Sequence, residues 1–505
     1  MEAIVTTHHQ VSVGGRVLRY TARAGHIPIR DNEAGEVHAN MFFVAYTLDQ
    51  ASGAKPRPLT FLWNGGPGSN SGLVQLLGFG PKRITAATGK MPPYSPSGTA
   101  LVDNQETWLL YSDLVFIDPI GTGYSRPTKA EYATEFYQGP GDAESVAEFI
   151  RVYRLRNDAF DSPLYLMGES YGVTRASLVS EALERRRTRV AGVVLLSGGF
   201  PVPNDVSAPV RAALTLPAYT AAAHYNKKLR DDLQRGSIND AVRAAQAYAE
   251  GDYARALARI DSLSPVERDA VAAQLERFTG LPASQIDKRT LRVSIELMSN
   301  GLLSSAGQMV GRYDSRLVGP RDTTQGPYDP TTDPSLKDIL DAISVTHYLR
   351  EELGFKSDLF YQGPFGGGYP PPTTFRGDWM STRWGRGAAP PAGPSGRGGS
   401  AGGGARGGGG DGGRGGPTAP TAQPQGLGAA LETDPRLRVF VACGYFDLNA
   451  GCFASEYAAR HLPPSLANRV MARVYGGGHA TYTDDNARRQ LQADFAKFVQ
   501  QGGTK

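Results

Sequence analysis

Apolar residues along the chain follow two patterns. In some segments they alternate with polar residues, and in others they form continuous runs. Residues 11–24 read VSVGGRVLRYTARA, where apolar and polar positions alternate on both sides of a Gly-Gly pair, and NMFFVAYTL follows at 40–48. This alternation predicts half-buried strands, the first two joined by a tight turn. Continuous apolar runs predict buried strands; they are PLTFLW (58–63), DLVFIDP (113–119), PLYLM (163–167) and VAGVVLLSGG (190–199).

Helical segments separate several of these strands. The pattern predicts a helix over about 141–156, a second directly after residue 170, and a last one near 486–500. Further strands are expected in RLRVFVACGYFDLNAG (436–451) and NRVMARVYGGGHATYTDD (468–485). Apolar strands that alternate with helices indicate an α/β fold, with a largely parallel sheet covered on both faces.

Between residues 201 and 353 the pattern becomes helical. SPVERDAVAAQLERF carries a capping box at Ser264 to Glu267, and SLKDILDAISVTHYLREELG ends on a glycine stop. The block is too long for a sheet connection, so it reads as an insertion. The predicted organisation is a core over 1–200, a helical cap insertion over 201–384, a Gly/Pro-rich disordered insertion over 385–430 and the rest of the core over 431–505.

Composition changes this picture in one place. Apolar residues make up 40% of the chain, and many of its 62 glycines fall in the segment that begins at residue 385, which cannot bury a core. Arg-Gly-Gly repeats at Arg397, Arg406 and Arg414 raise RNA binding as an alternative. They lack interleaved aromatic residues and include Asp411, which favours a flexible surface insertion.

Charge and cysteine content exclude several classes of function. A net charge of +4 on 505 residues predicts neither a nucleic-acid partner nor a membrane-surface protein. Membrane insertion is not expected, because no run of roughly 18 apolar residues occurs. Cys443 and Cys452 exclude a disulfide scaffold and a cysteine zinc site, and they either form one bridge or stay free. We expect no metal and no cofactor. The sequence does not indicate the oligomeric state.

The chain begins MEAIVTTHHQVSVGG, which lacks the basic start and the apolar run of a signal peptide. The sequence as written is therefore that of a cytoplasmic protein or of the mature form of an exported one.

The candidate chemistry begins at Gly168-Glu169-Ser170-Tyr171-Gly172, between a strand and a helix. A sharp turn at this point strains the central residue and holds its side chain out above the sheet, and the flanking glycines allow neighbouring segments to pass closely. The pattern predicts a serine nucleophile at Ser170. The alternative is a turn with no catalytic role.

A serine nucleophile needs an imidazole base and an acid that orients it, in the chain order Ser, acid, His. The histidines after Ser170 are His224, His347, His461 and His479. The first two fall in the helical insertion and the third near a helix end, where structural roles are expected. His479 and Asp447 follow the last two predicted strands, which favours them as base and acid.

An oxyanion hole requires two backbone N–H groups aimed at the developing charge. One is expected from Tyr171, and the other from the loop WNGGPGSNSG after the strand at 58–63. A glycine-rich loop can instead hold a phosphate, but the Lys and Ser/Thr of a P-loop are absent.

Four motifs in order resemble the serine carboxypeptidases, peptidase family S10 of the α/β-hydrolase superfamily, in its bacterial branch. They are WNGGPGSNSG, DPIGTGYS, GESYG, and the late pair GYFDLNAG with GGGHATY. The resemblance covers about residues 58–200 and 436–485 and implies an α/β-hydrolase fold with a helical cap insertion. It also implies a role for each of the following residues: Ser170 as nucleophile, His479 as base, Asp447 as its orienting acid, Gly66 and Tyr171 as oxyanion donors, and Asn64, Gly65 and Glu169 as ligands of a peptide's C-terminal carboxylate.

The sequence departs from the family pattern at two positions. The family commonly has a second glutamate two residues before a Gly-Pro, and Gly78 stands there in LLGFGPKRI. Gln75, Lys82 and Arg83 are the candidates to replace its side chain. Ser69 occupies the place of a frequent cysteine.

Three functions from different classes follow. The leading hypothesis is a serine-type carboxypeptidase that hydrolyses C-terminal residues of peptides through an acyl-enzyme on Ser170. The alternative keeps the triad but acts as a serine esterase or acyltransferase, which Gly78 favours. The third, a non-catalytic binding protein on this scaffold, is disfavoured because Ser170, Asp447 and His479 are all present.

Overall fold

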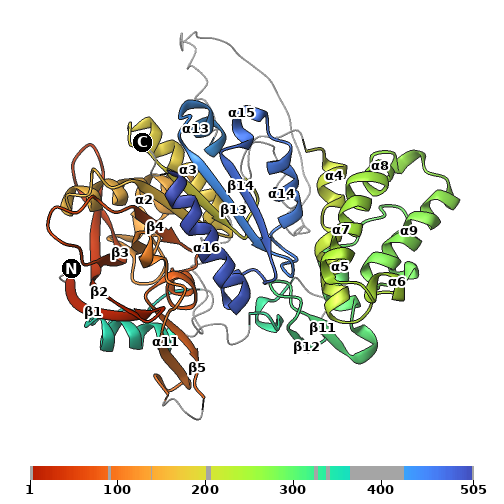
Figure 1. Cartoon of the computed structure of the whole chain (residues 1–505), viewed down its shortest axis with the longest axis horizontal. Helices are drawn as coiled ribbons and strands as arrows, with labels where there is room; N and C mark the ends of the chain where they lie inside the picture. The colour runs from red at the N-terminus through yellow and green to blue at the C-terminus, as the bar shows by residue number, and fades with distance from the viewer. Residues whose placement is uncertain are drawn as a thin grey trace, which may run out of the picture.

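The computed structural model describes residues 4–88, 93–137, 139–200, 206–323, 328–336, 342–363 and 426–502. The Gly/Pro-rich insertion expected over 385–430 lies outside the described residues as far as residue 425. One large sheet crosses the molecule in the order β1-β2-β3-β7-β4-β9-β10-β13-β14, with β8 paired to β3 (Figure 1). Its strands are β1 (Val5–Val13), β2 (Arg16–Arg30), β3 (Val37–Leu48), β4 (Leu59–Trp63), β7 (Asp113–Ile117), β8 (Arg126–Pro127), β9 (Leu164–Glu169), β10 (Gly192–Leu196), β13 (Arg438–Gly444) and β14 (Val470–Tyr475).

The first strands are antiparallel and the rest of the sheet is parallel. β1 and β2 form a hairpin whose turn is Gly14-Gly15, both with positive φ, as two-residue hairpin turns require. From β7 through β14 every pairing is parallel. The largely parallel sheet expected from the alternation of strands and helices is confirmed.

Two apolar clusters cover the two faces of the sheet. One face packs against α2 (Gly139–Arg156), α3 (Tyr171–Arg185) and α13 (Leu427–Thr433). The other packs against α16 (Asp485–Gly502) and the segment that contains α11 (Ala342–His347). Since both faces are buried, the central strands are apolar on both sides, as in the fully buried β4 and β10.

The helical block projects from the sheet (Figure 1). Its helices share a third apolar cluster with the end of β13, the loop that follows it and α14 (Cys452–Arg460). The capping box expected at Ser264 and Glu267 is confirmed, and its helix ends at Gly280 with φ +69°. The helices of the block are α4 (Ala208–Ala213), α5 (Leu216–Tyr225), α6 (Asp231–Gln234), α7 (Ile238–Tyr248), α8 (Ala254–Ala258), α9 (Pro265–Thr279) and α10 (Ile295–Gly301).

Smaller elements connect these layers. Two hairpins, β5 (Lys82–Ala86) with β6 (Thr99–Asp103) and β11 (Gln308–Val310) with β12 (Val318–Pro320), lie outside the large sheet. The remaining described helical turns are η1 (Val74–Phe79), η2 (Trp108–Leu110), η3 (Ala130–Tyr132), α1 (Ala133–Phe136), η4 (Ala249–Tyr253), η5 (Ile260–Ser262), η6 (Ala283–Gln285), η7 (Ser304–Ala306), η8 (Pro330–Thr332), η9 (Tyr348–Glu352), α14 (Cys452–Arg460), α15 (Pro464–Ala467) and η11 (Thr481–Thr483).

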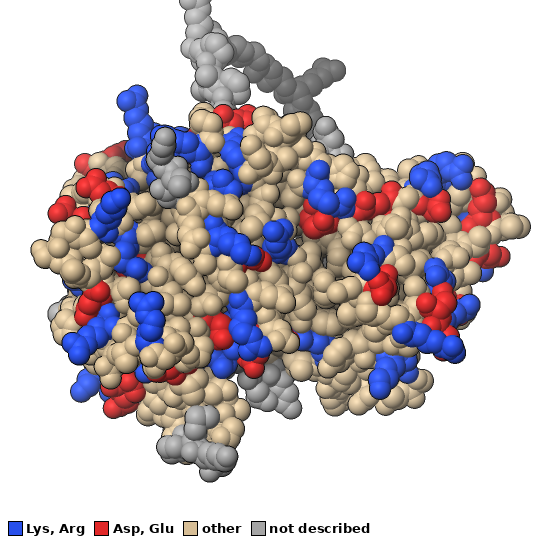
Figure 2. Space-filling model, in the orientation of Figure 1, with Lys and Arg blue, Asp and Glu red and all other residues tan. Residues whose placement is uncertain are grey.

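Acidic and basic side chains are interspersed over the face shown in Figure 2. Many are paired, as Arg243 is with Asp240 and Arg255 with Asp252 on the helical block. Each helix in the described part of the chain is too short or too polar to cross a membrane. Cys443 and Cys452, whose pairing was open from the sequence, are joined by a disulfide that closes the loop between β13 and α14.

Candidate active site

Ser170 stands at a strained turn between β9 and α3. Its φ of 59° and ψ of −124° are unusual for a residue with a side chain, and its N–H donates to the Leu196 carbonyl oxygen at 2.9 Å. A Cβ on Gly168 would collide with the carbonyl oxygen of Gly172, and a Cβ on Gly172 would lie 2.9 Å from the Trp63 ring. The close approach of these segments is the reason for the two glycines of Gly-x-Ser-x-Gly.

The Asn-Gly-Gly loop after β4 packs directly on this turn. A Cβ on Gly65 would lie 2.5 Å from both the backbone carbonyl oxygen of Glu169 and the backbone nitrogen of Tyr171, so only glycine fits there. Arg175, on α3, donates from Nη1 to the Asn64 carbonyl oxygen at 2.8 Å and from Nε to Asp142 Oδ2 at 2.6 Å. A buried ion pair therefore ties the loop to the helix that follows Ser170.

His479 and Asp447 lie together at the ends of the last two strands. His479 Nδ1 is 2.6 Å from Asp447 Oδ2, and the carboxylate also accepts from the N–H groups of Asn449 and Ala450 at 2.8 and 3.1 Å. The Asp447 side chain is 0% exposed. Burial lowers the pKa of His479, but the charge and the hydrogen bond of Asp447, together with the charge of Glu169, outweigh burial, and the net pKa is raised.

A loop from the helical block supports the histidine. The Tyr313 carbonyl oxygen accepts a hydrogen bond from the backbone N–H of His479 at 2.6 Å. The Tyr313 ring stands edge-on to the imidazole, with 5.1 Å between the ring centroids. Arg316 pairs with Asp314 of the same loop at 2.7 Å and with Asp484, beyond His479, at 2.8 Å. The position of His479 thus depends on the insertion as well as on the sheet.

A cavity of about 330 Å³ opens over Ser170. Among the described residues the Ser170 hydroxyl makes no side-chain hydrogen bond, but Ser170 and His479 both line this cavity. Asp447, the hydrogen-bond partner of His479, does not line the cavity, and neither do Gly65 and Tyr171. The lining residues are Asn64, Gly66, Ser69, Leu73, Leu77, Arg83, Ile84, Thr85, Glu169, Ser170, Tyr313, Asp314, Leu317, Ser335, Leu336, His479, Ala480 and Thr483.

Glu169 is buried at the base of the cavity and is 2% exposed. Burial raises its pKa to about 7, against the opposing effects of the His479 charge and of a hydrogen bond from Tyr482. Its carboxyl group therefore keeps its proton to a higher pH than an exposed glutamate does.

The residue that fills the space above Gly78 is Tyr482. A Cβ on Gly78 would lie 3.1 Å from Cγ of the Tyr482 ring, and the Tyr482 hydroxyl donates to Glu169 Oε2 at 2.8 Å. Of the three candidates to replace the missing carboxyl, Gln75 donates to Tyr46 in the core and Lys82 pairs with Asp103. Arg83 lines the cavity.

Two polar groups of the cavity wall have no hydrogen-bond partner within the described residues. They are Asn64 Nδ2, a donor, and Ser69 Oγ, a donor or an acceptor. Buried polar groups are normally satisfied, so unpartnered ones in a cavity indicate where a ligand's polar atoms bind. Sequence reasoning assigned no role to Ser69 and did not single out Arg175, Tyr313 or Tyr482, because their contacts join segments that are far apart in the chain.

The other histidines considered have structural contacts. His224 Nε2 lies 3.1 Å from the Gly236 oxygen, His347 packs edge-on against Tyr94, and His461 Nδ1 lies 2.8 Å from the Tyr457 oxygen. None of the three lines the cavity.

The amino-acid sequence matches that of a known protein family. The family model described as serine carboxypeptidase matches residues 15–292. The chain belongs to the serine carboxypeptidase family. Its fold is that of the α/β-hydrolases, as expected from the sequence: the crystal structure of Kex1(delta)p, a prohormone-processing carboxypeptidase from Saccharomyces cerevisiae, matches with a TM-score of 0.53 and 15% identity, over 95% of this chain and 91% of that one.

Curated serine carboxypeptidases are similar over shorter stretches. The pheromone-processing carboxypeptidase kex1 of Aspergillus niger is 29% identical over 197 residues, which is 36% of this chain and 28% of the relative. The retinoid-inducible serine carboxypeptidase of Rattus norvegicus is 27% identical over 229 residues, 43% of this chain and 44% of the relative. The matched segments therefore span less than half of either relative.

Proposed function

We propose that this protein is a serine-type carboxypeptidase, which releases C-terminal residues of peptides through an acyl-enzyme on Ser170. The observation that carries the proposal is one cavity wall that combines Ser170, His479 and the buried Glu169. A nucleophile and its base lie beside a carboxyl group that is partly protonated at neutral pH. A neighbouring proton donor of this kind favours a substrate that ends in a carboxylate.

The catalytic cycle assigns a step to each residue. His479 Nε2 accepts the Ser170 proton as the hydroxyl oxygen attacks the last peptide carbonyl, while Asp447 holds the imidazole with its proton on Nδ1. The oxyanion of the tetrahedral intermediate accepts hydrogen bonds from the N–H groups of Gly66 and Tyr171. Collapse breaks the C–N bond, and the departing amine takes the proton from His479. Water then hydrolyses the ester by the same steps.

Recognition of the substrate's end uses two other residues of the cavity wall, Asn64 and Glu169. Asn64 Nδ2, which has no other partner among the described residues, and the proton on Glu169 both donate to the C-terminal carboxylate. The Gly65 N–H is already bound to Asn64 Oδ1 at 2.6 Å, so its contribution is to hold the Asn64 amide in place. The partner is accordingly a peptide with a free C-terminus.

Release of C-terminal amino acids from a mixed peptide library tests the proposal. We expect release from free-acid peptides, and labelling of Ser170 by a fluorophosphonate probe in the unmodified protein but not in Ser170→Ala. An enzyme that takes the probe but cleaves only esters, with no release from any peptide, supports the esterase or acyltransferase alternative. A protein that neither reacts with the probe nor cleaves is the binding protein of the third hypothesis.

A further inference from the structure

Glu169 has a tyrosine as its partner, from a segment far away in the sequence. Tyr482 is 0% exposed, does not line the cavity, and places its hydroxyl 2.8 Å from Glu169 Oε2. Its ring packs on Gly78 and edge-on against Phe79, with 5.2 Å between ring centroids. A Cβ at residue 78 would press on this ring, which would have to shift by a few tenths of an ångström.

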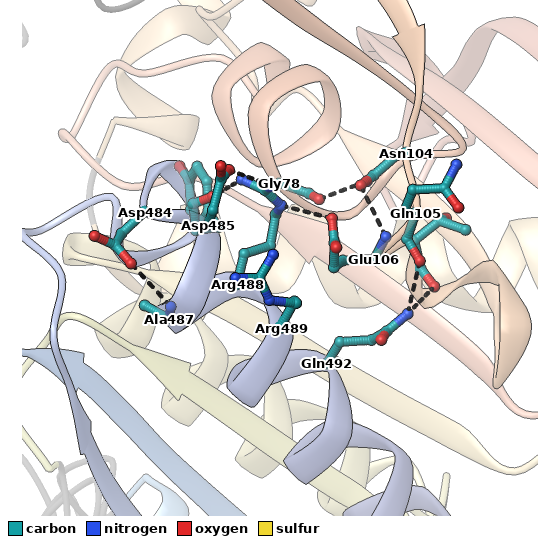
Figure 3. A network of polar contacts seen from close by, with 12 residues as sticks. Gly78, Asn104, Gln105, Glu106, Asp484, Asp485, Ala487, Arg488, Arg489 and Gln492 are labelled. Carbon is teal, nitrogen blue, oxygen red and sulfur yellow. Dashed lines mark hydrogen bonds and ion pairs between the residues drawn. The ribbon is translucent and has the colours of Figure 1, made fainter. Parts of the chain in front are cut away.

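A polar network holds both sides of this contact in place (Figure 3). Arg488, on α16, donates to the Tyr482 carbonyl oxygen at 3.0 Å and pairs with Glu106 at 2.9 Å and with Asp485 at 2.6 Å. Asn104 donates to the carbonyl oxygens of Gly78 and Gly80, both at 2.8 Å. The Gly78 backbone and the Tyr482 backbone are therefore linked through Asn104, Glu106 and Arg488.

The hydroxyl of Tyr482 donates to Glu169 Oε2, which is its only hydrogen-bond partner among the described residues. Burial, together with the charge and the hydrogen bond of Glu169, raises the tyrosine pKa well above its ordinary value, so the hydroxyl keeps its proton. The oxygen that accepts from it, Oε2, is the carbonyl oxygen when Glu169 is neutral. The carboxylic proton then resides on Oε1, which has no partner among the described residues.

We infer that Tyr482 is a positioning residue, which directs the proton of Glu169 into the cavity so that it donates to the substrate's C-terminal carboxylate. The inference rests on the proposed carboxypeptidase function and names the form of its carboxylate site. That site is a single carboxyl with a fixed neutral donor behind it. The proton on Glu169 is thus the part of the free C-terminus preference that titrates, beside the Asn64 amide and the Arg83 side chain, which also line the cavity.

The charged and titratable groups near Glu169 decide which measurement isolates its proton. His479 and Asp447 act on it electrostatically from the side of the triad, and Tyr482 lies behind it. Arg83 and Asp314 line the cavity, and Asp314 is paired with Arg316. Since His479 serves all substrates, the ratio of kcat/KM for a free-acid peptide to kcat/KM for its C-terminal amide cancels the triad and reports the proton on Glu169.

The experiment measures this free-acid preference between about pH 5 and 9. In the unmodified enzyme the free-acid preference should fall with rising pH as Glu169 loses its proton, with a midpoint near the Glu169 pKa of about 7. Tyr482→Phe removes a hydrogen bond to the ionised carboxyl, so the midpoint should rise by roughly one to two pH units. The preference below the midpoint should fall roughly 3- to 10-fold, mostly in KM, because the proton is no longer directed.

Two further variants make the test specific. Tyr475→Phe is the matched control, because the buried Tyr475 hydroxyl also donates to a carboxylate, Asp494, at 2.9 Å, but away from the cavity. The midpoint of the free-acid preference should not move in this variant. Glu169→Gln should abolish the pH step altogether. An unchanged midpoint in Tyr482→Phe, or a persistent step in Glu169→Gln, overturns the inference. Failure of the unmodified enzyme to release any C-terminal residue counts instead against the proposed function.

Discussion

Replacing Arg175 tests how the oxyanion loop is held. Arg175 and Asp142 are 1% and 2% exposed, and the guanidinium is the donor to the Asn64 carbonyl oxygen. Arg175→Met leaves a buried carboxyl without its partner, which costs about 3–5 kcal/mol in free energy of unfolding. The change also frees the loop that carries Gly66. Displacement of a reacting or stabilising group by about 1 Å costs roughly 100-fold in rate.

A second substitution separates stability from positioning. In Arg175→Met/Asp142→Leu no buried charge remains, so most of the lost stability should return. The Asn64 carbonyl still lacks its donor, so kcat should remain roughly 100-fold low. Arg185→Met is the matched control on the same helix: its side chain is 54% exposed, and its loss should cost less than about 1 kcal/mol.

The stability deficit of Arg175→Met should also depend on pH. Burial raises the pKa of Asp142 to about 6, although Arg175 lowers it, and without Arg175 it rises further. A carboxyl whose folded pKa lies above its unfolded pKa of about 3.9 destabilises the fold as pH rises. The deficit should thus be small near about pH 4 and largest above the folded pKa.

Denaturant unfolding and ester hydrolysis, measured on the same samples, check these outcomes. Full activity in the double variant would refute the positioning role of Arg175. A double variant as unstable as Arg175→Met would refute the account of the buried pair.

The remaining predictions concern the triad and the cavity base. Ser170→Ala should lower peptide release about 10⁴-fold or more with an unchanged melting temperature, and near-normal turnover would end the nucleophile assignment. The raised His479 pKa predicts that kcat/KM for esters climbs with pH through an acid limb above the ordinary value of 6.5; a limb clearly below it would contradict the effect of Asp447. Gly78→Glu should destabilise the protein by about 1–3 kcal/mol, because its Cβ alone would press on the Tyr482 ring, and unfolding at the unmodified midpoint would show that the ring moves aside.

Much of the fold and of the reactive centre was readable from local sequence. Glycines at 14 and 15, the capping box at Ser264, and the glycines that flank Ser170 act over a few residues, where steric rules and hydrogen bonds depend on neighbours in the chain. The buried strands were found for a similar reason, since a strand covered on both faces is apolar throughout. Motif order then indicated the fold class.

The chemistry of the carboxylate site depends on contacts that no local pattern contains. Tyr482 reaches Glu169 across 313 positions, and Arg175 reaches Asn64 across 111. Because Gly78 has no side chain, the sequence showed only a missing carboxyl there, whereas the fold brings a tyrosine ring into that space. The raised pKa of Glu169 is likewise a consequence of burial, which arises only when the fold brings the end of β9 together with the turn η11 that carries Tyr482.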